Sequence, residues 1–247
     1  MSDTPLTQIW VYLAASPLLW LTATLVCYLT ALKIYRLGKS HPLLNPVVIA
    51  VGLLIGLLVL TRTSYETYFN GAQFIHFLLG PATVSLAIPL YRQRERLKVL
   101  APLILVALPV GVLTAALSAV WLGSLFGADP ATLISLAPKS VTTPVAMGIS
   151  EKLGGIPSLT AVLVIGTGII GAIFGTGLLR LLGCRDDAVQ GFAMGLAGHG
   201  IGTARSFQVN ATMGAFAGLA MALSAFTTAL MLPPLLRWIG LVSQLPV

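Results

Sequence analysis

Charged side chains are scarce in this sequence. Only 9% of its 247 residues are Asp, Glu, Lys or Arg, whereas 57% are hydrophobic. Soluble globular domains carry about 25% charged residues, so the composition excludes an ordinary water-soluble domain. We therefore expect an integral membrane protein whose main surrounding is the lipid bilayer.

Cysteines and catalytic clusters are also nearly absent. Cys27 and Cys184 are the only cysteines, and no group of Cys, His, Asp and Glu has the spacing of a metal site. We expect no disulfide framework, no metal and no other cofactor. No pair of nucleophile and general base stands out, so we do not expect an enzyme. The start lacks the basic region and cleavage site of a signal peptide, so the first helix should remain uncleaved in a bacterial plasma membrane.

Long apolar segments are abundant instead. Segments 130–150 and 188–204 are shorter or carry a charge, so we interpret them as broken or re-entrant elements. The sequence thus predicts an all-α polytopic membrane bundle of seven or eight segments, in one domain over residues 1–247. Six charge-free runs reach or exceed the roughly 20 residues that a spanning helix needs: residues 4–32, 42–61, 67–91, 99–128, 153–179 and 206–236.

The basic residues lie in short loops between these runs. The chain has 14 Lys and Arg against 7 Asp and Glu, an excess that could suggest nucleic acid. Basic loops between apolar runs are instead typical of membrane topology, and no nucleic-acid partner is expected. The loops at residues 33–41 and 92–98 should face the cytoplasm, which places the N-terminus outside. Beyond residue 130 the loop charges nearly cancel, so this rule assigns no sides there.

Two local patterns predict helices. Asn45 fits an N-cap and Pro46 a first turn, so a helix should begin there. Residues 157–179 contain five glycines, and small residues let membrane helices approach closely. We expect this glycine-rich helix at the centre of the bundle. We also expect the last helix, residues 211–236, to end at Pro233, Pro234 and Arg237.

A polar run, Pro-Lys-Ser-Val-Thr-Thr-Pro, interrupts the apolar sequence at residues 138–144. Pro138 and Pro144 each lack a backbone donor and clash with the carbonyl four residues earlier, so the helix should break. Lys139 at the bilayer centre costs roughly 2.5–3.5 kcal/mol and requires a partner. The alternative is that Lys139 snorkels from a helix end and the prolines mark an ordinary loop.

Three hydroxyls stand within one turn of this cation, on Ser140, Thr142 and Thr143. They can satisfy freed backbone or orient a ligand. The half-helix after the break would direct its amide donors and positive dipole end toward the same place. The combination favours an anion such as a carboxylate, bound by Lys139 and the hydroxyls.

A second polar stretch, residues 195–206, is rich in glycine. We expect His199, Thr203 and Arg205 to line the same site, near the bilayer midplane and facing Lys139. His199 titrates near neutral pH, so a proton could travel with the anion. The alternative is a His199 that only packs or caps unwound backbone. No strand precedes the stretch, which excludes a Rossmann site. The predicted break includes three glycines: Gly198, Gly200 and Gly202.

Residues 79–84 echo the first polar run at an offset of 57 residues. The two stretches share Leu, Pro and Val, and the echo predicts a further break with Pro81 and Thr83. Broken helices in corresponding positions are the best sequence indication of a transporter site. The echo is compatible with a parallel repeat, with an inverted repeat and with no repeat at all.

The motifs together resemble the LrgB/CidB family over about residues 40–240. The resemblance is carried by residues 79–84, 138–144, 154–157 and 199–205. Two departures are Gly198, where Ser or Ala would be expected, and a less acidic stretch at residues 210–214, which leaves the role of that turn open.

The resemblance implies a bacterial membrane protein, usually described as an antiholin-like regulator of murein hydrolase activity. Such proteins are usually encoded beside a small membrane partner of the LrgA/CidA type, and a homo-oligomer is compatible with this. The plant relatives form the membrane half of the plastid glycolate/glycerate translocator, which implies transport of small carboxylates such as glycolate, glycerate, lactate or pyruvate. From the broken, cation-bearing elements we favour the transporter, with the antiholin-like regulator as the alternative.

Overall fold

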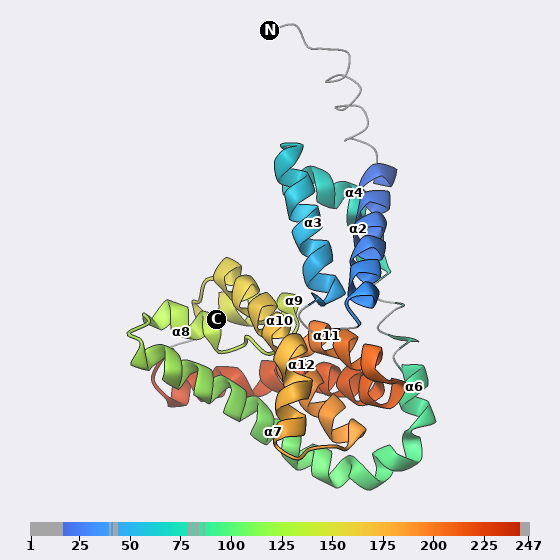
Figure 1. Ribbon diagram of the computed structural model, residues 1–247. Helices are drawn as coiled ribbons and strands as arrows, with labels where there is room; N and C mark the ends of the chain where they lie inside the picture. Colours follow the sequence, from blue (N-terminus) through green and yellow to red (C-terminus); the bar gives the residue numbers. More distant parts are fainter. Residues whose placement is uncertain are drawn as a thin grey trace, which may run out of the picture. The chain divides into compact units, whose positions relative to one another are not determined.

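The computed structural model describes residues 17–39, 41, 44–78, 81, 84–85 and 87–242. The regular elements of these residues are helices, which confirms the predicted all-α class. Contacts divide the chain into two compact units, Met1–Ser85 and Leu86–Val247 (Figure 1). The single-domain organisation expected from the sequence stays a prediction.

Unit 1 contains α2 (Pro17–Leu37), α3 (Pro46–Leu60) and α4 (Tyr65–Phe77), with α2 packed against both of the others. The Asn45 side chain accepts a hydrogen bond from the Val47 amide at 2.9 Å, so the predicted start of α3 is confirmed. Helix α4 ends at Phe77, inside the third predicted segment, residues 67–91, where a break was expected with Pro81 and Thr83. Pro81 is exposed, and Thr83 lies outside the described residues.

Unit 2 holds the rest of the described chain. Aspartates cap two of its helices: Asp129 accepts from the Thr132 amide at 3.1 Å, and Asp186 from the Ala188 amide at 2.8 Å. The helices of unit 2 are α6 (Ala87–Arg92), α7 (Arg94–Leu125), α8 (Pro130–Leu136), α9 (Thr143–Leu153), α10 (Pro157–Leu181), α11 (Asp187–Val209) and α12 (Ala211–Trp238).

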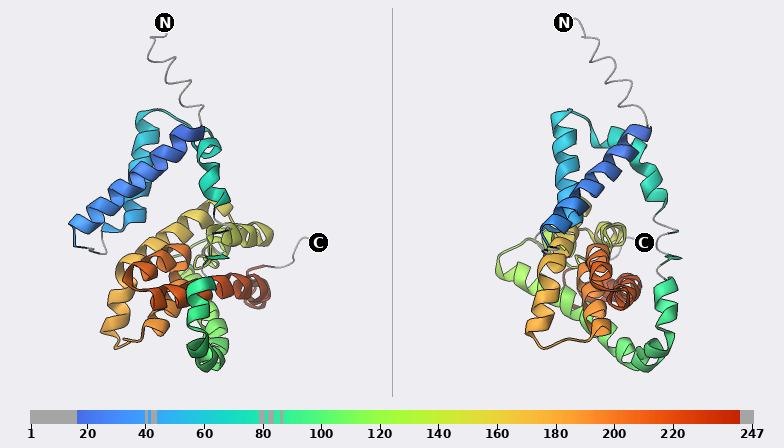
Figure 2. Two further views of the ribbon diagram at one scale, coloured as in Figure 1. Left: turned by 90° about the vertical axis from the view of Figure 1, so that its right-hand side faces the viewer. Right: turned by 45° about the vertical axis from the view of Figure 1, so that its right-hand side comes forward.

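Four helices in the described residues are long and apolar enough to cross a membrane, namely Leu18–Leu37, α7, α10 and α12. Pro102 and Pro109 lie inside α7, whose path curves in Figures 1 and 2 (green), as proline predicts. The last helix, predicted over residues 211–236, is α12, which continues through Pro233 and Pro234 and ends two residues later, at Trp238. Membrane helices tolerate proline where neighbouring groups satisfy the freed backbone.

Polar contacts gather one set of helix starts at the same end of unit 2. Arg96, in the first turn of α7, forms an ion pair with Asp186, the cap of α11. Gln93 donates to the Thr212 hydroxyl at the start of α12 at 3.2 Å. The starts of α7, α11 and α12 therefore share one end, which we call the basic end because it contains residues 92–98.

The other end is held by apolar packing. Val120, Leu153 and Leu236, from the final turns of α7, α9 and α12, belong to one buried cluster. The turn between α9 and α10 follows Leu153 directly, so it lies at this opposite end too. These contacts assign relative sides to the loops beyond residue 130, where the loop charges could not.

Helix α11 is broken at a single residue. His199 has φ 40° and ψ −132°, with helical backbone before and after it. A Cβ on Gly202 would strike the carbonyl oxygen of Met194, eight residues earlier. Eight residues of straight helix span about 12 Å. The two halves of α11 therefore fold back on each other, with His199 at the tip.

The close contacts of glycines give the helix directions. Gly191 lies against Met213 and Gly195 against Ala217, so the first half of α11 runs parallel to α12. On α10, Gly168 lies against His199 and Gly175 against Met194, so the same half runs antiparallel to α10. It follows that α10 and α12 are antiparallel.

Unit 2 contains an inverted repeat with an offset of 57 residues. The cap Asp129 corresponds to Asp186, and Gly183 corresponds to Gly240; these two glycines follow the long helices with φ of 79° and 77°. Both copies end in Leu-Leu-Arg-x-x-Gly, at residues 178–183 and 235–240. Each copy is a half-helix, a break, a second half-helix and a long helix, and the long helices α10 and α12 run in opposite directions.

A buried hydroxyl cluster joins α8, α9 and α10. Ser135, Ser150 and Thr160 are fully buried. Thr160 Oγ1 lies 2.8 Å from Ser150 Oγ and 3.1 Å from the Ser135 carbonyl oxygen, and the Ile156 amide donates to Ser135 Oγ at 2.7 Å. No sequence pattern indicated this cluster, which fixes both half-helices of the first break to α10.

Replacing Thr160 tests this role. Thr160→Val keeps the shape of the side chain but removes the hydroxyl that binds the Ser135 carbonyl oxygen and Ser150 Oγ. The protein should therefore lose about 1 kcal/mol of stability. Thr160→Ser retains the hydroxyl and should unfold nearly as the parent does. Thermal unfolding in detergent measures both. Equal unfolding temperatures for parent and Thr160→Val would show that the cluster does not hold the half-helices.

Candidate functional site

The first break lies between α8 and α9. After α8 ends at Leu136, the Lys139 amide donates to the Leu136 carbonyl and the Val141 amide to the Pro138 carbonyl, both at 3.2 Å. These turns lead to Thr142, the cap of α9. Pro138 thus lies in the break itself. Pro144 instead occupies the first turn of α9, where a missing amide hydrogen is not needed, so it begins a half-helix rather than breaking one.

The second break is narrower than the sequence suggested. Of residues 198–202 only His199 leaves the helical region, whereas Gly198, Gly200 and Gly202 have helical backbone. Such a backbone conformation costs a non-glycine residue about 1–3 kcal/mol, so the surrounding structure must hold His199 in it. The Thr203 hydroxyl donates to the His199 carbonyl at 2.8 Å and satisfies backbone freed by the break.

The His199 ring is buried against α10. Its Nε2 lies 2.9 Å from the Val164 carbonyl oxygen, and the ring faces Gly168, where a Cβ would lie 2.6 Å from Cε1. Because a carbonyl oxygen only accepts, Nε2 carries the hydrogen. Nδ1 is then the ring nitrogen at which a proton can be gained or lost.

The two breaks meet on α10. Val141, from the first break, packs in one buried cluster with Val164, whose carbonyl binds His199 from the second. Helices α9 and α10 are antiparallel, with Ser150 beside Thr160 and Ala146 beside Val164. One further turn along this pairing places Thr142 beside Gly168. Val164 and Gly168 lie near the middle of α10, so the meeting point lies at mid-depth.

Lys139 is half-buried there. Within the described part of the chain no carboxylate pairs with it, and its hydrogen bond to Ser140 Oγ is long at 3.5 Å. Thr142 makes no side-chain cap hydrogen bond to α9. A cation, a hydroxyl and the amide end of α9 are therefore together, without an anion to complement them among the described residues.

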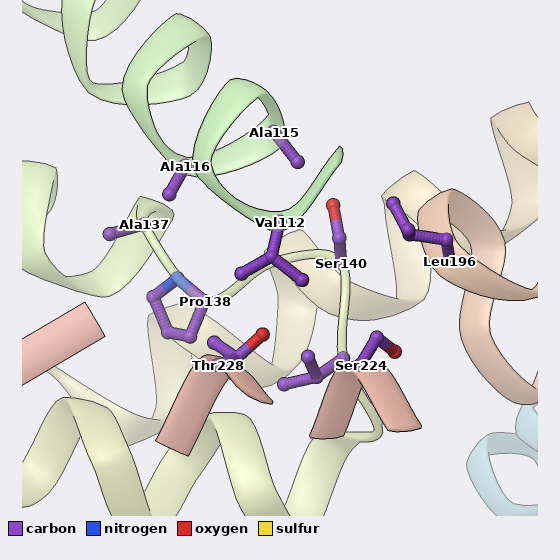
Figure 3. A pocket seen from close by; sticks show the side chains of 10 residues that line it. Val112, Ala115, Ala116, Ala137, Pro138, Ser140, Leu196, Ser224 and Thr228 are labelled. Atoms are coloured by element: carbon purple, nitrogen blue, oxygen red, sulfur yellow. The ribbon is translucent and has the colours of Figure 1, made fainter. Parts of the chain in front are cut away.

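A small cavity adjoins the first break. It measures about 10 Å³, room for about one water molecule. Figure 3 shows Val112 of α7, Ser140 of the break, and Ser224 and Thr228 of α12 around it. Ser224 donates to the Met221 carbonyl at 3.0 Å. Ser224 and Thr228 could not be found from the sequence, because single hydroxyls in an apolar helix give no pattern.

Arg205 lies further from the tip. It is six residues beyond His199, about 9 Å along the second half of α11. It is buried, with 9% of its surface exposed, and its Nη1 donates to Gln208 Oε1 at 3.3 Å. The structure thus brings together Lys139, Ser140, Thr142 and His199, and sets Arg205 toward the basic end.

Comparisons with known proteins agree with the motifs. The LrgB-like family matches residues 24–238. The protein YwbG of Bacillus subtilis is 34% identical, over 87% of this chain and 95% of its own length. The holin-like protein CidB of Staphylococcus epidermidis is 32% identical over 88% of this chain and 95% of its own length, and that of Staphylococcus aureus is 32% identical over 89% and 95%.

No solved structure matches this chain significantly. The family match covers most of both units, and the relatives align over nearly their whole lengths. This chain, a helical membrane bundle with two broken elements, belongs to the LrgB-like family.

Proposed function

We propose that this protein binds a small monocarboxylate at the two helix breaks and carries it across the plasma membrane, without acting as an enzyme. The observation that carries the proposal is Lys139, a half-buried cation with no carboxylate partner among the described residues, beside the amide end of α9. A charge at this depth is costly unless paired, and a bound carboxylate would pair it. The hydroxyls of Ser140, Thr142 and Thr143 then orient the anion.

The proposed orientation follows from the basic end of unit 2. Residues 92–98 carry four basic side chains and one acidic one. By the positive-inside rule this end faces the cytoplasm. The same rule puts the basic loop at residues 33–41 in the cytoplasm, and the N-terminus of the chain outside. The turn between α9 and α10 then faces outward.

The second candidate is a holin-like or antiholin-like regulator of murein hydrolase activity and lysis, acting with a small LrgA/CidA-type membrane protein. The names of the staphylococcal relatives, holin-like protein CidB, support this function more directly than they support transport. The geometry favours the carrier, because the space at the first break is about 10 Å³, which suits a closed site rather than an open pore.

Lys139→Ala separates the two candidates. In liposomes, loss of the cation should reduce uptake of labelled glycolate, lactate or pyruvate by roughly thirtyfold or more, since removing one partner of a buried charge pair costs about 2–5 kcal/mol. Lys139→Arg keeps the charge and should retain part of the uptake. Uptake by Lys139→Ala at the parental rate would contradict the assigned role of Lys139. Release of a large trapped dye by the parent would favour a pore.

His199→Gln tests proton coupling. A glutamine amide can still donate to the Val164 carbonyl but cannot take up a proton, so the packing is retained and the titration is lost. If each ligand increases the affinity of the other, an inward proton gradient should concentrate labelled substrate in the parent. His199→Gln should lose this accumulation and keep substrate exchange. Accumulation that is unchanged in His199→Gln would exclude His199 as the proton carrier.

A further inference from the structure

A groove runs along α9 on the side that faces α12. Its volume is about 380 Å³, and its lining includes Pro144, Gly148 and Lys152 of α9 and Ala229 and Pro233 of α12. Pro144 lies in the first turn of α9, next to the first break, whereas Lys152 lies in the last turn, at the end opposite the basic end. The groove therefore connects that end of unit 2 with the start of α9.

The inner end of the groove lies at the start of α9, directly after the first break. Ser140 of the break lines the small cavity and Pro144 of α9 lines the groove, although the two linings share no residue. The lining carries a cation at its mouth, Lys152, and the positive end of the α9 dipole near its inner end. This polarity complements a small anion. Gly148 leaves the groove open midway, since nothing lies within 4 Å of a Cβ placed there.

The corresponding surface of the other repeat is closed. An offset of 57 residues relates Ala229 and Pro233 of α12 to Ala172 and Thr176 of α10, which are 0% and 6% exposed. On the second half of α11, Arg205 and Ser206 correspond to Gly148 and Ile149. Ser206 is 0% exposed. The first half of α11 covers α10 here, whereas its counterpart α8 has only seven residues.

We propose that the groove between α9 and α12 is the entry route of the carboxylate from the α9–α10 turn side, and that its repeat counterpart between α10 and the second half of α11 opens toward the basic end in a second conformation. The inference rests on the proposed carrier function. Two inverted copies of one packing arrangement have two related states, in which the open and the closed copy exchange. Lys152 steers the anion to the mouth.

Cysteine labelling tests the route in a full-length protein with Cys27→Ser and Cys184→Ser. Gly148→Cys should react with methanethiosulfonate ethylsulfonate, an anionic and impermeant reagent, from the α9–α10 turn side only. Saturating glycolate, lactate or pyruvate, whichever the parent transports, should slow the reaction, and the labelled protein should lose most uptake. Gly177→Cys on α10 also has open space but lies outside the groove, so its labelling should leave uptake unchanged and show no substrate protection.

Ser206→Cys reports on the closed copy. It should be unreactive without substrate and become reactive from the basic end during substrate exchange. Persistent protection of Ser206→Cys during exchange would overturn the second conformation, and labelling of Gly148→Cys with full uptake would overturn the entry route. Because labelling is read by mass spectrometry, these results differ from failure of the proposed function, which is absence of carboxylate uptake in the parent.

Lys152→Gln tests the mouth of the route. Steering is electrostatic, so the variant should raise the half-saturating substrate concentration severalfold at low salt, with an unchanged maximal rate and little effect at high salt. Arg180→Gln removes an exposed cation of α10 outside the groove and should change neither value. A salt-independent effect of Lys152→Gln, or an equal effect of Arg180→Gln, would contradict steering by Lys152.

Discussion

The fold of unit 2 depends on one constraint. The backbone polar groups freed at the two breaks, and the charge of Lys139 at mid-depth, must find partners without water. The hydrogen bond between His199 Nε2 and the Val164 carbonyl meets part of this need, and it joins the tip of one broken element to the middle of α10. Val141 brings the other break to the same residue. Neither break is tolerable alone in a bilayer, because unsatisfied polar groups there cost several kcal/mol each. Their meeting therefore determines the arrangement of the surrounding helices.

Glycine makes this arrangement sterically accessible. Gly168 leaves room for the His199 ring, and Gly191 and Gly195 let the first half of α11 touch the backbone of α12. Close packing of this kind replaces the hydrophobic drive that water supplies to soluble proteins. The hydroxyl cluster around Thr160 has the complementary task of holding α8 and α9 on α10. The site is thus placed by small residues and hydroxyls that bind nothing themselves.

The two broken elements belong to copies of one inverted repeat, but their surroundings differ. The copies share capping aspartates and a closing Leu-Leu-Arg-x-x-Gly, yet the first has Lys139 in its break at the position where the second has Leu196. The proposed anion site is consequently asymmetric, with the cation on one element and the titratable His199 on the other. The same asymmetry distinguishes an open groove beside α9 from the buried surface beside the second half of α11.

The sequence by itself determined the helical membrane class, the start of α3 at Asn45, the family, and the presence of breaks near Pro138 and His199. These features are local: apolar run length, capping residues, and prolines or glycines that interrupt a helix. The sequence also pointed to an offset of 57 residues, but on residues 79–84, and the described structure carries the repeat on residues 129–183 and 186–240.

Only the tertiary structure decided the inverted relation of the copies, the pairing of both breaks on Val164, and the parts played by Ser135, Ser150, Thr160 and Thr228. The physical reason is that direction and contact depend on chain reversals whose outcome no local pattern records. The fold-back at His199 is one such case, since glycine density predicted an unwound stretch where close packing confines the distortion to one residue.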